Sequence, residues 1–179
     1  MRIKRILNKS SFHIQKGVIG LIAYFNSRLY MRLYNRLLKQ HGFKLRGTPR
    51  FIARSAKFDD FRKITLGDRL VVSMNVHFLT HDYSYTTALI AVDKKPETDI
   101  GLLREITVGD NVFIGMNSIL LPGTKIGNNV IIGAGSVVRG DIPDYSVVTG
   151  NPATVVSDIR DFANKALERK EKTLLIDKK

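Results

Sequence analysis

The sequence contains no cysteine among its 179 residues. This excludes disulfides, zinc–thiolate centres and a cysteine nucleophile. Long apolar runs are also missing, because none approaches the ~20 residues that a membrane-spanning helix needs. Proton transfer near neutral pH has only four histidine candidates: His13, His41, His77 and His81. A chain of this length, with 44% hydrophobic residues, is sized for about one domain with its own core.

Acidic residues are absent from the N-terminal part of the chain. Residues 1–50 hold twelve Lys or Arg and no Asp or Glu, whereas residues 51–179 hold seventeen against sixteen. The net charge of +13 therefore belongs almost entirely to one end. Because a nucleic-acid-binding domain would not lose its basic character at one boundary, we expect no nucleic-acid partner.

Residues 1–46 are predicted to form a basic amphipathic helical arm. Apolar residues recur there at steps of three or four, namely Val18, Ile22, Phe25, Leu29, Leu33 and Leu37. Basic residues follow the same spacing beside them, namely Arg28, Arg32, Arg36 and Lys39. Ser10 or Ser11 is expected to cap the helix start, and Gly42 is placed to end it.

Two partners suit this arm. Tyr24, Tyr30 and Tyr34 are amphipathic rings of the kind found at membrane–water boundaries. Residues 1–45 therefore suit an anionic membrane surface, which would make an otherwise cytoplasmic protein peripheral to the inner face of the cytoplasmic membrane. The alternative is that the apolar stripe packs on the body of the protein or on a partner subunit.

From Val108 to Pro143 the chain divides into six consecutive hexads. Position one is aliphatic in all six, position two is glycine in four, and position five is small or β-branched in all six. The stretches Leu66–Val71 and Val72–His77 begin the same phase upstream, and Ile52–Lys57 is a weaker copy offset by two residues.

A six-residue period predicts a triangular coil, because three short strands joined by tight bends return the chain to its starting azimuth. Position one then points inward and stacks on its counterparts in neighbouring coils. Position five must fit inside a corner. Position two is expected at a bend, where glycine or asparagine tolerates the required backbone angles.

The repeat resembles that of the hexapeptide-repeat, left-handed β-helix proteins. Within Ile106–Val156, the stretches Ile126–Asn129, Ile132–Val138 and Gly150–Ala153 are similar to acetyl-CoA-dependent O-acetyltransferases of galactosides, maltose and surface polysaccharides. The resemblance implies an all-β solenoid, a left-handed parallel β-helix of about five to six coils.

Three segments are expected around this solenoid. The β-helix is predicted over residues 47–156, with a loop extruded at about residues 81–105, where the period is lost. Residues 157–179 are predicted to form a short helix that caps the coil end. Its apolar residues lie at helical spacing, namely Ile159, Phe162, Ala163, Ala166 and Leu167.

The resemblance implies that His81, at the mouth of the loop, is the general base. An imidazole there would take the proton of a sugar hydroxyl as the oxygen attacks the thioester. Asp82 and Tyr83 are the candidates for binding the acceptor, and Asp82 is also a candidate for orienting the imidazole. Three other carboxylates are rivals for that orienting role, namely Asp93, Asp99 and Glu105.

By resemblance, acetyl-CoA lies along the backbone of the coils. The residues expected to bind it are Gly115, Met116, Gly133, Ala134, Gly150 and Asn151. Arg139 interrupts an apolar stretch, and its guanidinium is a candidate partner for a cofactor phosphate. The alternative for Arg139 is an ordinary solvated surface residue.

The resemblance implies transfer of an acetyl group from acetyl-CoA to a sugar hydroxyl, by a homotrimer with sites between subunits. Two alternatives remain: sugar N-acetylation on the same fold, and a non-enzymatic scaffold at a membrane. Serine acetyltransferases share the repeat but carry a larger, less basic N-terminal domain. Carbonic anhydrases of this fold bind zinc through three histidines, and the repeat region here holds only His77 and His81, so no metal is expected.

Overall fold

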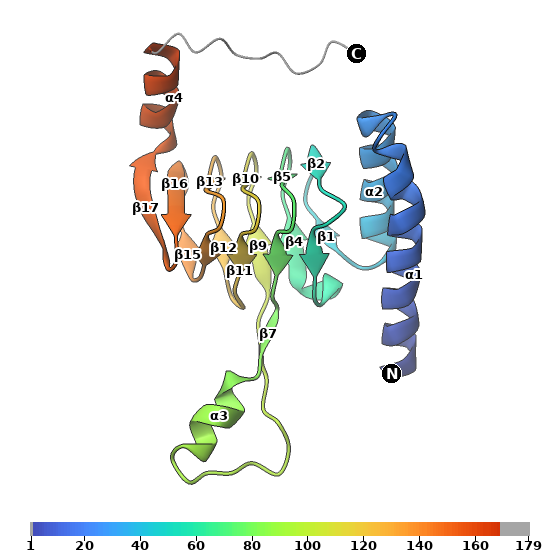
Figure 1. The fold of residues 1–179 in the computed structure, drawn as a ribbon, viewed down its shortest axis with the longest axis vertical. Coiled ribbons are helices and arrows are strands. Elements are labelled where there is room, and N and C mark those ends of the chain that lie inside the picture. Colours follow the sequence, from blue (N-terminus) through green and yellow to red (C-terminus); the bar gives the residue numbers. More distant parts are fainter. Residues whose placement is uncertain (1, 169–179) are drawn as a thin grey trace.

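The computed structural model describes residues 2–168, with side chains from residue 7 onward. The chain forms a coil of short strands with two helices across its N-terminal end (Figure 1). A hairpin with a helix at its tip protrudes from the middle of the coil, and a further helix follows the last strand.

The basic arm is two helices rather than one. Helix α1 (Arg2–Ile22) and helix α2 (Ser27–Gln40) lie side by side, and Asn26 separates them. The Asn26 side chain accepts a hydrogen bond from the amide of Leu29 at 2.9 Å, which starts a new helix. The predicted caps Ser10 and Ser11 were wrong, because both serines lie inside α1.

The predicted end of the helix at Gly42 is confirmed. Gly42 has a φ of +98°, a conformation that glycine adopts without steric cost. The amide of Phe43 donates back to the carbonyl of Leu38 at 3.1 Å, as in a helix that ends at a left-handed glycine.

Helix α2 packs its apolar face on the protein itself. The buried residues of α2 are Tyr30, Met31, Tyr34, Leu37 and Leu38. The Tyr30 hydroxyl donates to the carbonyl of Ile52 at 2.8 Å. Tyr30 and Tyr34 were therefore wrongly expected at a membrane boundary, since both lie inside the core.

Helix α1 is held on the coil by a few contacts on one side. The Phe12 ring lies 4.5 Å from that of Phe61. The ammonium of Lys16 donates to the carbonyl of Ala56 at 2.5 Å and lies near the ring of Phe58. Burial lowers the pKa of Lys16 to about 8. The opposite side of α1 remains exposed.

The strands form three parallel sheets, here called walls. The first wall contains β1 (Lys44–Leu45), β4 (Ile64–Leu66), β9 (Ile106–Val108), β12 (Lys125–Ile126) and β15 (Asp141–Ile142). The second contains β2 (Phe51–Ile52), β5 (Val71–Val72), β10 (Phe113–Ile114), β13 (Ile131–Ile132), β16 (Ser146–Gly150) and the antiparallel β17 (Ala153–Asp158). The third contains β3 (Lys57–Phe58), β6 (His77–Phe78), β11 (Ile119–Leu120) and β14 (Val137–Val138).

The chain visits the walls in the repeating order first, second, third. One hexad therefore advances the chain by one wall, and about eighteen residues return it to the same wall one coil further on. Residues six apart thus lie at neighbouring corners, whereas residues about eighteen apart lie at the same corner.

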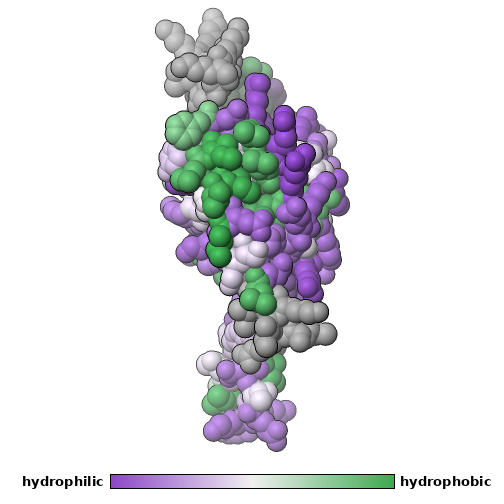
Figure 2. All heavy atoms as spheres, turned by 90° about the vertical axis from the view of Figure 1, so that its right-hand side faces the viewer, coloured by the Kyte–Doolittle hydropathy of each residue, from purple (hydrophilic) through white to green (hydrophobic). Residues whose placement is uncertain are grey.

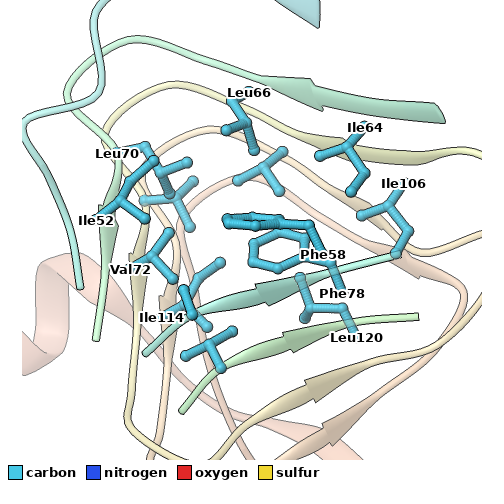
Figure 3. Packing of buried hydrophobic residues seen from close by; sticks show 14 of the residues in the cluster. Ile52, Phe58, Ile64, Leu66, Leu70, Val72, Phe78, Ile106, Ile114 and Leu120 are labelled. Atoms are coloured by element: carbon cyan, nitrogen blue, oxygen red, sulfur yellow. The ribbon is translucent and has the colours of Figure 1, made fainter. Parts of the chain in front are cut away.

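The interior is filled from all three walls, as predicted for positions one and five. Position-one residues of the hexads from Val108 to Val138 are all buried, and so are the position-five residues from Val112 to Ser136. Figure 3 shows the aliphatic side chains pointing inward around Phe58 and Phe78. The two phenylalanine rings lie 4.8 Å apart on adjacent coils.

Glycine at position two was attributed to the backbone angles of a bend, and this reason was wrong. The left-handed residues lie at position four, including Asn111, Asn117 and Asn129, with φ values of 53–59°. In the four hexads that carry it, glycine stands at position two because successive coils approach too closely there for a side chain. A Cβ on Gly115 would lie 2.5 Å from the backbone nitrogen of Ala134 on the next coil.

Replacing Asn129 with alanine is expected to lower the free energy of unfolding by about 1 kcal/mol relative to Asn129→Gly. Both variants lose the hydrogen bond that Asn129 Oδ1 accepts from Asn111 at 2.8 Å, so the difference isolates the cost of φ at +55°. Urea unfolding measures it. Equal stability of the two variants would show that this bend tolerates a Cβ without strain.

The six-residue period is broken at two places, which explains the hexads that do not fit it. A 3₁₀ turn, η1 (Phe61–Lys63), adds two residues between β3 and β4, which accounts for the offset of the Ile52 copy. The bend after Val138 is two residues shorter than the others. Ile142 therefore pairs with Ile126, a position-one residue, and was wrongly placed at position five.

The coil is interrupted once by a protruding hairpin. Strands β7 (His81–Asp82) and β8 (Leu102–Leu103) pair antiparallel at its base, and α3 (Ser84–Ile90) lies near its tip (Figure 1). None of the α3 residues is buried.

The C-terminal helix was wrongly expected to cap the coil. Helix α4 (Ile159–Glu168) projects beyond the last strands, and its Phe162 and Leu167 are 51% and 77% exposed. The reason is that β17 folds back on β16 and occupies the edge that the helix would have covered. The remainder of the predicted helix, residues 169–179, lies outside the described residues.

Candidate active site

His81 lies where the chain leaves the coil to form the hairpin. Thr80, the residue before it, is fully buried, and its carbonyl accepts from the amide of Arg104 at 3.0 Å on the returning strand. The imidazole itself is 41% exposed. The fold thus holds the backbone of His81 rigidly while its ring faces solvent.

Asp59 orients the imidazole. Its Oδ2 lies 3.1 Å from Nδ1 of His81 and also accepts from the amide of Thr80 at 3.1 Å. The Asp59 side chain is only 15% exposed. Because a carboxylate only accepts, Nδ1 carries the hydrogen, and the lone pair of Nε2 is left to take a proton from outside.

Asp82 has another partner. Its carboxylate accepts from the amide and the hydroxyl of Ser84, at 2.8 and 3.0 Å. These hydrogen bonds are the main reason that the pKa of Asp82 is lowered. The rival carboxylate Glu105 pairs with Lys44 at 3.0 Å. Asp59 therefore holds the orienting position for which Asp82 and its rivals were candidates.

Tyr83 stands beside the imidazole. Its ring meets that of His81 edge to face, with centroids 5.6 Å apart, and its side chain is 56% exposed. Gly101 lies under the same ring, where a Cβ would come within 3.0 Å of Tyr83. Tyr83 is thus the exposed aromatic surface next to the candidate base.

Six predicted cofactor-binding residues share one corner of the coil, between the second and third walls. We call it the glycine corner; it contains Gly115, Met116, Gly133, Ala134, Gly150 and Asn151. The amide of Gly115 donates to Ile132, and that of Gly133 to Val148 on the next coil. The bends therefore stack directly, and the glycines leave part of the backbone uncovered beside the side chain of Met116, which is 39% exposed.

Arg139 lies at a different corner, between the third and first walls, which it shares with His81. The charge of Arg139 contributes to the lowered pKa of Asp82, so it acts on the base of the hairpin. The separation follows from the repeat. Arg139 is six residues after Gly133 and so one wall further on. Within one chain, His81 and Arg139 occupy one edge and the glycine corner another.

Comparisons with known proteins agree with this architecture. The family model described as bacterial transferase hexapeptide (six repeats) matches residues 105–140. Protein CapG of Staphylococcus aureus is 35% identical over 153 residues, which cover 82% of this chain and 86% of CapG. The chain belongs to the hexapeptide-repeat acyltransferase family.

Two further relatives have more descriptive names. Galactoside O-acetyltransferase of Escherichia coli is 33% identical over 109 residues, which cover 58% of this chain but only 47% of that enzyme. A structure of galactoside acetyltransferase in complex with coenzyme A superposes with a TM-score of 0.59 at 21% identity, covering 87% of this chain and 84% of that one. The shared fold is the left-handed parallel β-helix of this acyltransferase family.

Sequence reasoning missed Asp59, although a signal for it exists. In the hexapeptide repeat, Phe58 and Phe78 are position-one partners on adjacent coils. Asp59 therefore lies beside the segment that leads to His81, despite a separation of 22 residues in the chain. A register that extended the repeat back through Ile52 and Phe58 would have placed it there.

In the part of the acyltransferase chain that the structure describes, no helix is both long and apolar enough to cross a bilayer. Among the same residues, no three His, Asp or Glu side chains gather in the way that metal ligands do.

Proposed function

We propose that this hexapeptide-repeat acyltransferase moves an acetyl group from acetyl-CoA to a hydroxyl of a sugar, with His81 as general base. The observation that carries the proposal is the His81–Asp59 pair at the mouth of the hairpin. The names of the galactoside O-acetyltransferase relative and of the coenzyme A complex support the substrate class.

The proposed chemistry is a direct transfer. Nε2 of His81 takes the hydroxyl proton while the sugar oxygen attacks the thioester carbonyl. The carbon–sulfur bond then breaks, and the imidazolium returns the proton to the leaving thiolate. Asp59 stabilises the imidazolium between these steps. Tyr83 and Asp82 are proposed to contact the acceptor from the base of the hairpin, and Arg139 to pair with a phosphate.

The proposed site needs two chains. Acetyl-CoA on the glycine corner would lie along a different edge from His81 of the same chain, so a neighbouring chain has to bring its glycine corner to His81. The outer face of the second wall suits such a contact, since its Phe51 and Phe113 are 38% and 43% exposed. The outer face of the first wall carries Lys44, Lys125 and Asp141 instead. We therefore propose a homotrimer with sites between subunits.

The acceptor is proposed to be a surface polysaccharide or its precursor. We also propose that residues 1–45 attach the cytoplasmic enzyme to the inner face of the cytoplasmic membrane, where lipid-linked precursors are at hand. The lack of acidic residues in the first 50 supports an anionic surface.

Release of coenzyme A from acetyl-CoA tests the activity. We expect release that depends on the acceptor when the protein is given a panel of sugars, nucleotide sugars and lipid-linked glycans. Mild alkali should remove the product's acetyl group, because an ester is labile where an amide survives; a stable product would indicate N-acetylation. No turnover with any acceptor, from a protein shown to be trimeric by light scattering, would favour the scaffold alternative.

A further inference from the structure

Helix α1 presents an apolar face that the fold does not use. Leu7, Ile14, Val18 and Leu21 are 61–69% exposed, and their spacing of seven, four and three places them on one side of the helix. Phe25, just beyond the helix end, is 91% exposed. Figure 2, which faces this end of the molecule, shows a contiguous apolar patch. We call these five residues the α1 patch.

The α1 patch is not needed to hold α1 in place. The helix is attached from its other side, where Phe12 is fully buried and Lys16 reaches the carbonyl of Ala56. Exposed apolar surface of this extent, grouped rather than scattered, marks a surface that meets something else.

The charges around the α1 patch indicate that the partner is anionic. The first 58 residues contain no Asp or Glu. Helix α2, which lies beside α1, exposes a basic stripe opposite its buried face, made of Arg28, Arg32, Arg36 and Lys39. Figure 2 shows hydrophilic side chains bordering the apolar patch. Two copies joined end to end would bring two basic stripes together, whereas anionic lipid complements them.

We propose that α1 lies in the plane of an anionic lipid bilayer, with the α1 patch buried among the acyl chains and the α2 stripe on the headgroups. The earlier expectation assigned the membrane contact to a stripe that ran through Leu37. The structure divides that stripe, because Leu37 is buried in the core and Leu29 is only 38% exposed, whereas Val18 and Phe25 are 64% and 91% exposed.

This placement suits the proposed function, on which its biological purpose rests. Helix α1 covers the N-terminal end of the coil, and His81 follows β6, the second strand of the third wall. Coils are spaced by about 5 Å, so the candidate base lies within a few coil spacings of that end. Lateral association of three coils would set three α1 patches on the same side, and their attachments would reinforce one another.

Sedimentation with vesicles tests the docking. The full-length protein is mixed with vesicles of phosphatidylcholine alone or with about one third phosphatidylglycerol. We expect binding to the anionic vesicles only, weakened by salt. The double variant Ile14→Gln, Val18→Gln should lower the partition coefficient at least about tenfold. The matched control Phe162→Gln, Leu167→Gln removes two exposed apolar side chains at the opposite end and should bind normally.

Several results would overturn the proposal. These are no binding to anionic vesicles at low salt, equal binding to neutral ones, or full binding by the Ile14, Val18 variant. A doubling of the particle mass that the same variant abolishes would identify a second copy as the partner instead. Release of coenzyme A with a soluble acceptor, measured in parallel, should be unchanged in this variant. It therefore separates a failure of docking from a failure of the proposed acetyl transfer.

Discussion

Replacing His81 with alanine is expected to lower kcat by about 10²- to 10⁴-fold, the range that a positioned general base contributes. The hydroxyl of a sugar is a weak nucleophile while it keeps its proton, and Nε2 of His81 is the proposed acceptor for that proton. Acetyl-CoA binding should change little, because His81 is not one of the glycine-corner residues that are proposed to hold the cofactor. Steady-state kinetics and a direct acetyl-CoA titration measure the two effects separately.

A second histidine serves as the control. His13 is exposed on α1, away from the hairpin, and His13→Ala should keep the kcat of the unmodified enzyme. Near-normal turnover by His81→Ala would remove His81 as the base. A large loss of acetyl-CoA affinity with unchanged kcat would make it a binding residue instead.

The Asp59→Asn variant is expected to lower kcat by about 10- to 10²-fold, with the affinity for acetyl-CoA retained. Asparagine keeps an oxygen for the amide of Thr80, so the local backbone should hold. It loses the charge that stabilises an imidazolium, while the oxygen that faces both Thr80 and Nδ1 is kept and the tautomer should be retained. Kinetics with saturating acetyl-CoA measure the loss.

Asp59 is proposed as a positioning residue, so its tests must exclude a merely structural effect. Asp59→Glu restores the carboxylate and should recover part of kcat, which a packing defect would not predict. The neighbouring Asp60→Asn removes a carboxylate from the same turn and should leave kcat within about twofold. Equal losses in Asp59→Asn and Asp60→Asn, with lowered thermal stability in both, would contradict the positioning role.

The repeat could be recognised in the sequence because its inward-pointing positions accept only a few residue types. A position-one side chain that points into a triangular interior must be apolar, so the period survives from Val108 to Val138 and is borne out by their burial. The reason for glycine was misjudged. The spacing of residues along the sequence does not show how closely Gly115 approaches Ala134 on the next coil. That close approach is the reason that position 115 is glycine.

The arm was predicted in outline and misjudged in detail for a similar reason. Helical spacing identifies an apolar face but not its partner. Leu37 and Val18 both fit one continuous stripe, yet Leu37 is 1% exposed and Val18 is 64% exposed. The break at Asn26 rotates α2 relative to α1, and only the packing of the two helices on the coil end decides which side of each is covered.

By itself, the sequence determined the coil, the interruption after Thr80 and the basic, acid-free N-terminal end. These follow from periodicity and composition, which are local properties of the chain. The tertiary structure alone decided that Asp59 meets His81 and that α1 rather than α2 keeps an exposed apolar face. Each of these depends on how one coil is stacked on the next or on how a helix is seated, and such contacts join residues that no local pattern links.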